Sequence, residues 1–85
     1  MKNEIDSKFV LSVFEKMRQH GEKQQENYVL GGLEAFTDFD GYTLFIEDAL
    51  VKLRFGFHNQ YDFEYAKEEH FEQFIKKMSA IEQNY

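Results

Sequence analysis

The chain has 85 residues, of which 42% are hydrophobic and 18% aromatic, and it contains no cysteine and no proline. We expect a single domain over residues 1–85, large enough for a core but too small for a deep cofactor cleft, and the lack of cysteine excludes disulfides and cysteine nucleophiles. The formal net charge of −6 makes nucleic acid and anionic membranes poor partners, and no apolar run suits a membrane span, so we expect a cytoplasmic protein.

The first predicted element is a helix from Ser7 to His20, because apolar residues recur along one side of this segment at helical spacing. Asp6 is placed to accept hydrogen bonds from amides of the first turn. Ile5 and Val10 have the spacing of a hydrophobic staple across the same turn. Gly21 predicts a left-handed stop at the other end.

The next segment, EKQQEN at residues 22–27, is polar and predicts an exposed connection. The glycine pair at residues 31–32 predicts a bend or bulge where the first long strand begins. An Asp-Gly pair follows at residues 40–41, and such a pair is typical of a two-residue hairpin turn. This turn would place Thr37 opposite Leu44.

A second tight bend, at residues 48–49, would place Leu44 opposite Leu53 in the third strand. With these registers the apolar partners share one side of the sheet. A slip of one residue would bury charged side chains instead, so we reject it.

Residues 61–65 admit two interpretations. A three-residue loop at residues 58–60 would make them a fourth strand, with Arg54 opposite Glu64 on the outer side. Alternatively, Asp62 caps the last helix and the sheet has three strands.

The last predicted helix runs from Ala66 to Gln83 and is again apolar along one side. We therefore predict a two-layer α+β fold: an N-terminal helix, an antiparallel meander of three to four strands, and a C-terminal helix. Both helices would cover the same apolar face of the sheet.

The opposite face is mostly charged, but Phe36 and Phe45 interrupt it as a cross-strand pair, flanked by Lys52 and Arg54. These four residues form a predicted contact patch, which favours a small, non-enzymatic protein-interaction module. The partner would be an unknown protein or a second copy of the chain. The same pair could also be an ordinary cross-strand contact, or be covered by residues 28–30.

Catalytic and metal-binding patterns are weak. Asp38, Asp40, Gly41 and Glu47 match positions of a calcium-binding loop, but Phe36 occupies its first position, which must supply an oxygen. The three histidines fall in separate elements without ligand spacing, and no serine or threonine lies in a nucleophile motif. We therefore predict no catalytic residue, no metal site and no cofactor.

The order helix, strands, helix resembles that of double-stranded RNA-binding domains. That family binds phosphates through lysines at the start of its last helix, whereas here Lys67 is followed by Glu68, Glu69 and Glu72. Nucleic acid is therefore an unlikely partner. A nucleic-acid-linked role, by RNA binding or by an acidic surface that mimics phosphates, remains the alternative hypothesis.

The stretch NYVLGGLEAFTDFDGYTLFIEDALVKLRFGFHNQYDFEY, residues 27–65, is similar to short uncharacterised bacterial proteins grouped as a domain of unknown function. This resemblance implies a small bacterial cytosolic protein, and it implies no activity.

Overall fold

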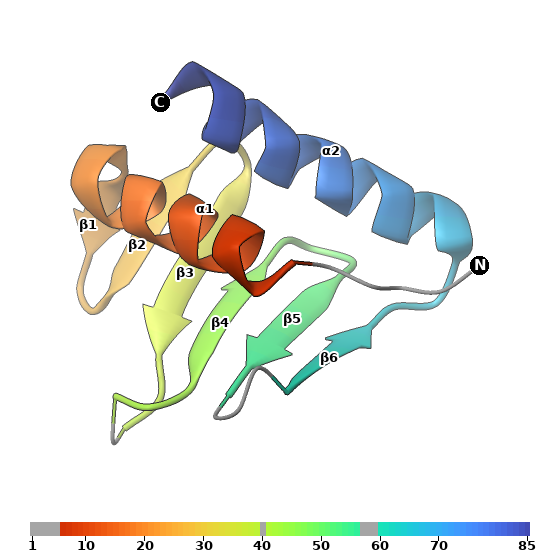
Figure 1. Cartoon of the computed structure of the whole chain (residues 1–85), viewed down its shortest axis with the longest axis horizontal. Helices are drawn as coiled ribbons and strands as arrows, with labels where there is room; N and C mark the ends of the chain where they lie inside the picture. The colour runs from red at the N-terminus through yellow and green to blue at the C-terminus, as the bar shows by residue number, and fades with distance from the viewer. Residues whose placement is uncertain (1–5, 40, 57–59) are drawn as a thin grey trace.

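The computed structural model describes residues 6–39, 41–56 and 60–85. Within these residues, two helices lie on one face of a six-stranded antiparallel sheet whose strands are neighbours in chain order (Figure 1). The predicted α+β class and helix-sheet-helix order are confirmed, but the sheet has six strands instead of three or four. The elements are α1 (Ser7–His20), β1 (Glu22–Gln24), β2 (Asn27–Leu30), β3 (Leu33–Thr37), β4 (Leu44–Glu47), β5 (Lys52–Phe55), β6 (Tyr61–Glu64) and α2 (Glu68–Asn84).

Helix α1 has the predicted bounds. The Asp6 side chain accepts a hydrogen bond from the Lys8 amide at 3.0 Å, so it caps the helix as expected. Val10 is fully buried. Ile5, the other half of the predicted staple, lies outside the described residues.

The predicted left-handed stop at Gly21 is wrong. Gly21 has φ −78° and ψ 166°, an extended conformation, and its amide donates to the Met17 carbonyl at 2.8 Å. A Cβ here would lie 2.5 Å from the Met17 oxygen and 2.9 Å from the Val29 oxygen, both backbone atoms. Glycine is therefore required by close packing of the backbone rather than by a positive φ.

The exposed connection predicted for residues 22–27 is instead the hairpin of β1 and β2. Gln24 pairs with Asn27, and the turn between them holds Gln25 at φ 59°. All three residues of β1 are exposed. Since this edge strand buries no side chain, it has no apolar alternation by which the sequence would signal it.

The two glycines at 31–32 form the turn between β2 and β3. Leu30 pairs with Leu33, and the glycines have φ 59° and 82°. The predicted bend at the start of β3 is thus confirmed, as a two-residue hairpin turn in which both central residues have positive φ.

The β3–β4 register is as predicted, with Thr37 opposite Leu44. The connection is hydrogen-bonded differently from the expected two-residue turn. The Gly41 amide donates to the Asp38 carbonyl at 2.9 Å, and Gly41 has φ 79°. Asp40 lies outside the described residues.

The predicted β4–β5 register is wrong by two residues, because Leu44 pairs with Phe55 and not with Leu53. The tight bend is replaced by a longer loop that the Asp48 side chain closes. Its Oδ1 accepts from the backbone amides of residues 50–51, at 2.8 Å each. An even shift leaves every side chain on its predicted face, so the layers are unchanged.

Residues 61–64 form strand β6, which decides between the two interpretations of this segment. Its register also differs by two residues from the prediction, since Arg54 pairs with Asp62 instead of Glu64. Of the three-residue loop predicted at residues 58–60, residues 58 and 59 lie outside the described residues.

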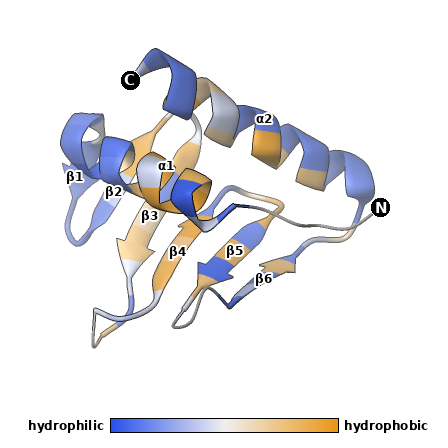
Figure 2. Cartoon of the chain, in the orientation of Figure 1, coloured by the Kyte–Doolittle hydropathy of each residue, from blue (hydrophilic) through white to orange (hydrophobic). Residues whose placement is uncertain are grey.

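Helix α2 begins at Glu68 rather than Ala66, because β6 continues to Glu64 and the chain needs the next residues to cross to the helical layer. α1 and α2 run in the same general direction over the sheet (Figure 1). Figure 2 shows apolar residues concentrated on β3, β4 and the sheet-facing side of α2, with β1 hydrophilic. The core is built from Val10, Val13, Met17, Leu33, Ala35, Ile46, Val51, Leu53, Phe55, Phe74, Met78 and Ile81. Neither described helix has the length and apolar character needed to cross a bilayer.

Candidate functional site

The outer face of the sheet is the side opposite the helices, and it contains the predicted aromatic pair. Phe36 and Phe45 alternate with the buried Ala35 and Ile46, so both rings point away from the core. They are partners in the register, and their rings stack with centroids 5.0 Å apart and an interplanar angle of 16°. Both side chains are half-buried. Residues 28–30, which could have covered the pair, lie beside it in the sheet as part of β2.

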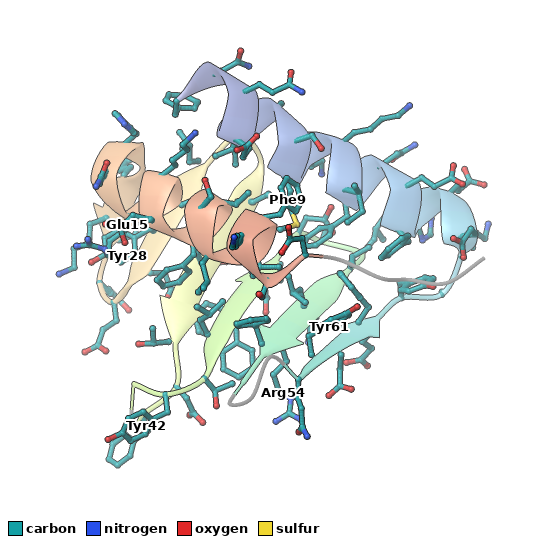
Figure 3. All side chains as sticks on the ribbon, viewed as in Figure 1. Phe9, Glu15, Tyr28, Tyr42, Arg54 and Tyr61 are labelled. Atoms are coloured by element: carbon teal, nitrogen blue, oxygen red, sulfur yellow. The ribbon has the colours of Figure 1, made fainter. Side chains whose placement is uncertain are left out.

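Strand β5 supplies the two predicted cations. Arg54 is the register partner of Phe45, and Lys52 is the partner of Glu47. The Arg54 guanidinium lies 3.0 Å from the Asp62 carboxylate, and these side chains are 61% and 68% exposed. Figure 3 shows Arg54 leaving β5 on the side away from the helices. An ion pair this exposed contributes little to stability, so the guanidinium can exchange partners at low cost.

All four predicted patch residues line one shallow hollow of about 300 Å³, which we call the outer hollow. Its walls are aromatic on β3 and β4 and charged on β5 and β6. The lining residues are Phe36, Phe45, Glu47, Lys52, Arg54, Asp62 and Glu64. The sequence pattern therefore identified side chains that the fold brings together.

A second hollow, of about 460 Å³, lies between α1 and the β1–β2 hairpin that the sequence analysis missed. Arg18 and Glu15 form an ion pair at its rim, and Lys23 lies 5.8 Å from the centroid of the Tyr28 ring. Figure 3 labels Glu15 on α1 and Tyr28 on β2, the two elements that border this hollow. The hydrogen bond from Arg18 lowers the pKa of Glu15, so the two charges compensate each other. The residues that line this hollow include Arg18, Lys23 and Glu26. None of the lining residues is a buried polar side chain that could fix the orientation of a ligand.

A family model described as a protein of unknown function, DUF3081, matches residues 5–85. The chain belongs to the DUF3081 family. No curated protein and no solved structure matches it. Membership confirms the predicted similarity to a domain of unknown function, and it assigns no chemistry to the DUF3081 chain.

Two of the carboxylates considered for calcium, those of Asp38 and Glu47, have other surroundings in the DUF3081 chain. Asp38 Oδ1 accepts from the Phe39 amide at 2.7 Å, which stabilises the turn. Glu47 lies on the outer face and lines the outer hollow. In residues 6–39, 41–56 and 60–85, no three His, Asp or Glu side chains gather as a metal would require.

The histidines of the DUF3081 chain occupy different surroundings. His20, in the last turn of α1, has its ring centroid 5.3 Å from that of Tyr85. His70, in the first turn of α2, is half-buried, and its Nδ1 has no hydrogen-bond partner among the described residues. His58 lies outside the described residues. The outer hollow is therefore the candidate site, because it combines aromatic surface with both signs of charge in one place.

Proposed function

We propose that this DUF3081 chain is a non-enzymatic protein-interaction module that binds its partner through the outer face of the sheet. One observation carries the proposal: the stacked pair of Phe36 and Phe45 lies in a hollow flanked by Lys52 and Arg54, on a sheet face that no described element covers. Aromatic side chains and arginine are the residue types enriched where proteins touch.

The shape of the outer hollow supports a macromolecular partner over a small ligand. Its volume of about 300 Å³ is at the lower end of the range for ligand pockets, and the charged groups around it are exposed. A small molecule would remain largely in water there. A protein surface can instead cover the aromatic pair completely and exclude water from the charges around it.

The experiment compares aromatic residues of the same hairpin inside and outside the hollow. Phe45→Glu places a carboxylate in the hollow, whereas Phe39→Glu makes the same exchange at a position that is fully exposed, at 105% of the reference area. Each variant, and the native sequence, is tagged and used for quantitative capture from the source cells. Circular dichroism establishes that all three are folded.

We expect the native chain and Phe39→Glu to retain the same protein, and Phe45→Glu to lose it by at least tenfold, because the variant lacks a central aromatic contact of the interface. Equal retention by all three chains would overturn the outer face as the contact surface.

We also propose that the module acts in the cytoplasm of a bacterium. The lack of cysteine suits a reducing compartment, since disulfides are the usual stabilisers of small exported domains. Fractionation of the source cells with an antibody against the chain tests the compartment, and recovery from the envelope or the medium would contradict it.

A further inference from the structure

The charges of the outer face are ordered by strand. Two rows of side chains cross the sheet at right angles to the strands, from β3 to β6, and the register defines them. In both rows the cation is on β5, with an acidic residue on β6. The first row is Glu34, Glu47, Lys52 and Glu64, and the second is Phe36, Phe45, Arg54 and Asp62.

We infer that the partner of the outer face is a second copy of this chain, related by a two-fold axis that runs parallel to the strands above the boundary between β4 and β5. This inference rests on the proposed function. Rotation about such an axis places each row of one copy opposite the same row of the other copy. It also places β4 of one copy opposite β5 of the other. Lys52 of one copy then lies against Glu47 of the other, and Arg54 lies against the ring of Phe45, each contact made twice.

An axis above the boundary between β5 and β6 would also pair opposite charges, but it lies at the edge of the sheet and leaves the aromatic pair on β3 and β4 uncovered. Four further positions of the axis bring like charges together at the centre. An axis above β4 sets Glu47 against Glu47 of the second copy, and an axis above β5 does the same with Lys52. An axis between β3 and β4 sets Glu34 against Glu47. An axis across the strands sets Lys52 against Arg54. Like charges held opposite each other are destabilising, so the arrangement over β4 and β5 is favoured among these.

The proposed contact is small. About this axis only strands β3 to β6 of the two copies face each other, and their four to five residues each present roughly 270 Å² of flat sheet, from the usual spacings along and between strands. A standard interface buries about 800 Å² on each partner. The twist of the two sheets also separates their corners, where Glu34 would approach Glu64 of the second copy. We therefore expect a reversible dimer that forms at high protein concentration.

The test uses two charge reversals, Lys52→Glu and Glu47→Lys. Each variant alone would set like charges against each other twice across the axis. An equal mixture restores both pairs, because one copy then supplies two carboxylates and the other two ammonium groups. Within each chain, residues 47 and 52 are also register partners, and mixing does not repair that pair. Rescue by mixing therefore reports only the contact between copies.

Sedimentation velocity of the native chain, each variant and the mixture is measured from about 10 µM to 1 mM, the range in which a contact below standard size dissociates. We expect the native chain and the mixture to move from 10.2 kDa towards twice that mass, and each variant alone to remain at 10.2 kDa. Thermal unfolding establishes that both variants are folded.

Two results would overturn the inference. A native chain that stays monomeric throughout excludes the second copy as partner, while the capture experiment above still decides whether the outer face binds another protein. A native dimer that neither reversal weakens, or a mixture that is not rescued, excludes this axis.

Discussion

The Lys77 ammonium lies 3.0 Å from Oδ2 of Asp48, which joins α2 to the loop between β4 and β5. The Asp48 side chain is only 7% exposed, and its other oxygen accepts from the amides of Leu50 and Val51. One carboxylate thus closes the loop and attaches it to the helical layer. Because the loop length sets the β4–β5 register, Asp48 also determines which residues meet across the outer face.

Asp48→Ala should lower the free energy of unfolding by about 2–3 kcal/mol, because two amides and an ammonium group lose their acceptor in a largely buried place. Asp48→Asn keeps an acceptor for the amides and should cost about 1 kcal/mol. Urea unfolding measures both values. The control is Asp38→Ala, which removes an exposed carboxylate that accepts from one amide and should cost less than about 1 kcal/mol. Equal losses for Asp48→Ala and Asp38→Ala would contradict this role.

Stability should also depend on pH through Asp48. Burial alone would raise the pKa of Asp48, but hydrogen bonds from the Leu50 amide, Lys77 and the Val51 amide together hold it below its ordinary value of 3.8. A pKa that is lower in the folded chain stabilises the fold above the unfolded pKa, and this stabilisation is lost as the pH falls through the folded pKa. The free energy of unfolding should therefore decrease as the pH is lowered from 3.8. The Asp48→Asn variant should show a weaker dependence of this free energy on pH in the same range. Parallel profiles for the two chains would exclude Asp48 as the titrating group.

The two glycines of the β2–β3 turn should differ in their tolerance of alanine. Both have positive φ, but a Cβ at Gly31 would lie 3.1 Å from Cγ1 of the buried Ile81, whereas one at Gly32 would lie 3.8 Å from Cδ of Lys77. Gly32→Ala should cost about 1 kcal/mol from the backbone alone, and Gly31→Ala about 2 kcal/mol or more. Chemical unfolding of the two variants checks the order, and a larger loss for Gly32→Ala would show that contact with Ile81 is not the deciding factor.

Lys16 should stabilise the end of the opposite helix. Its Nζ donates to the Glu82 carbonyl at 2.5 Å, and the last turn of α2 has no basic residue of its own. Lys16→Met should therefore speed amide exchange in that turn by about two- to fivefold, in line with the usual energy of a cation at a helix C-terminus. Lys8→Met, at the exposed start of α1, should leave it unchanged. Unaltered exchange in Lys16→Met would mean that packing alone holds the helix end.

The sequence predicts the layers better than the pairings, for a physical reason. Side chains alternate with period two along a strand, so the pattern shows which face each residue occupies. It therefore predicts one shared face for Phe36, Phe45, Lys52 and Arg54. A shift of two residues preserves every face. The pattern therefore cannot distinguish Leu44 opposite Leu53 from Leu44 opposite Phe55, and the choice depends on the hydrogen bonds that Asp48 makes.

The β1–β2 hairpin escaped sequence analysis for a different reason. Its residues 22–24 are all exposed, and its turn uses Gln25 at positive φ where glycine or asparagine would give a recognisable signal. Pairing with β2, which in turn pairs with β3, maintains this strand through tertiary context. The close approach of Gly21 to Val29 also cannot be predicted from the sequence, because it depends on the position of β2 in the fold.

The strict chain order of the meander has a consequence for how the molecule folds. Each strand pairs with a strand that lies only a few residues away in the chain. The hairpins can therefore form rapidly and in any order. The contact of α1 with the end of α2 is different, because Lys16 and Glu82 are 66 positions apart. Among the hydrogen bonds described here for residues 6–39, 41–56 and 60–85, this one closes the longest loop and so carries the largest loop-closure entropy. We therefore expect docking of the two helices to limit the rate at which the native state is reached.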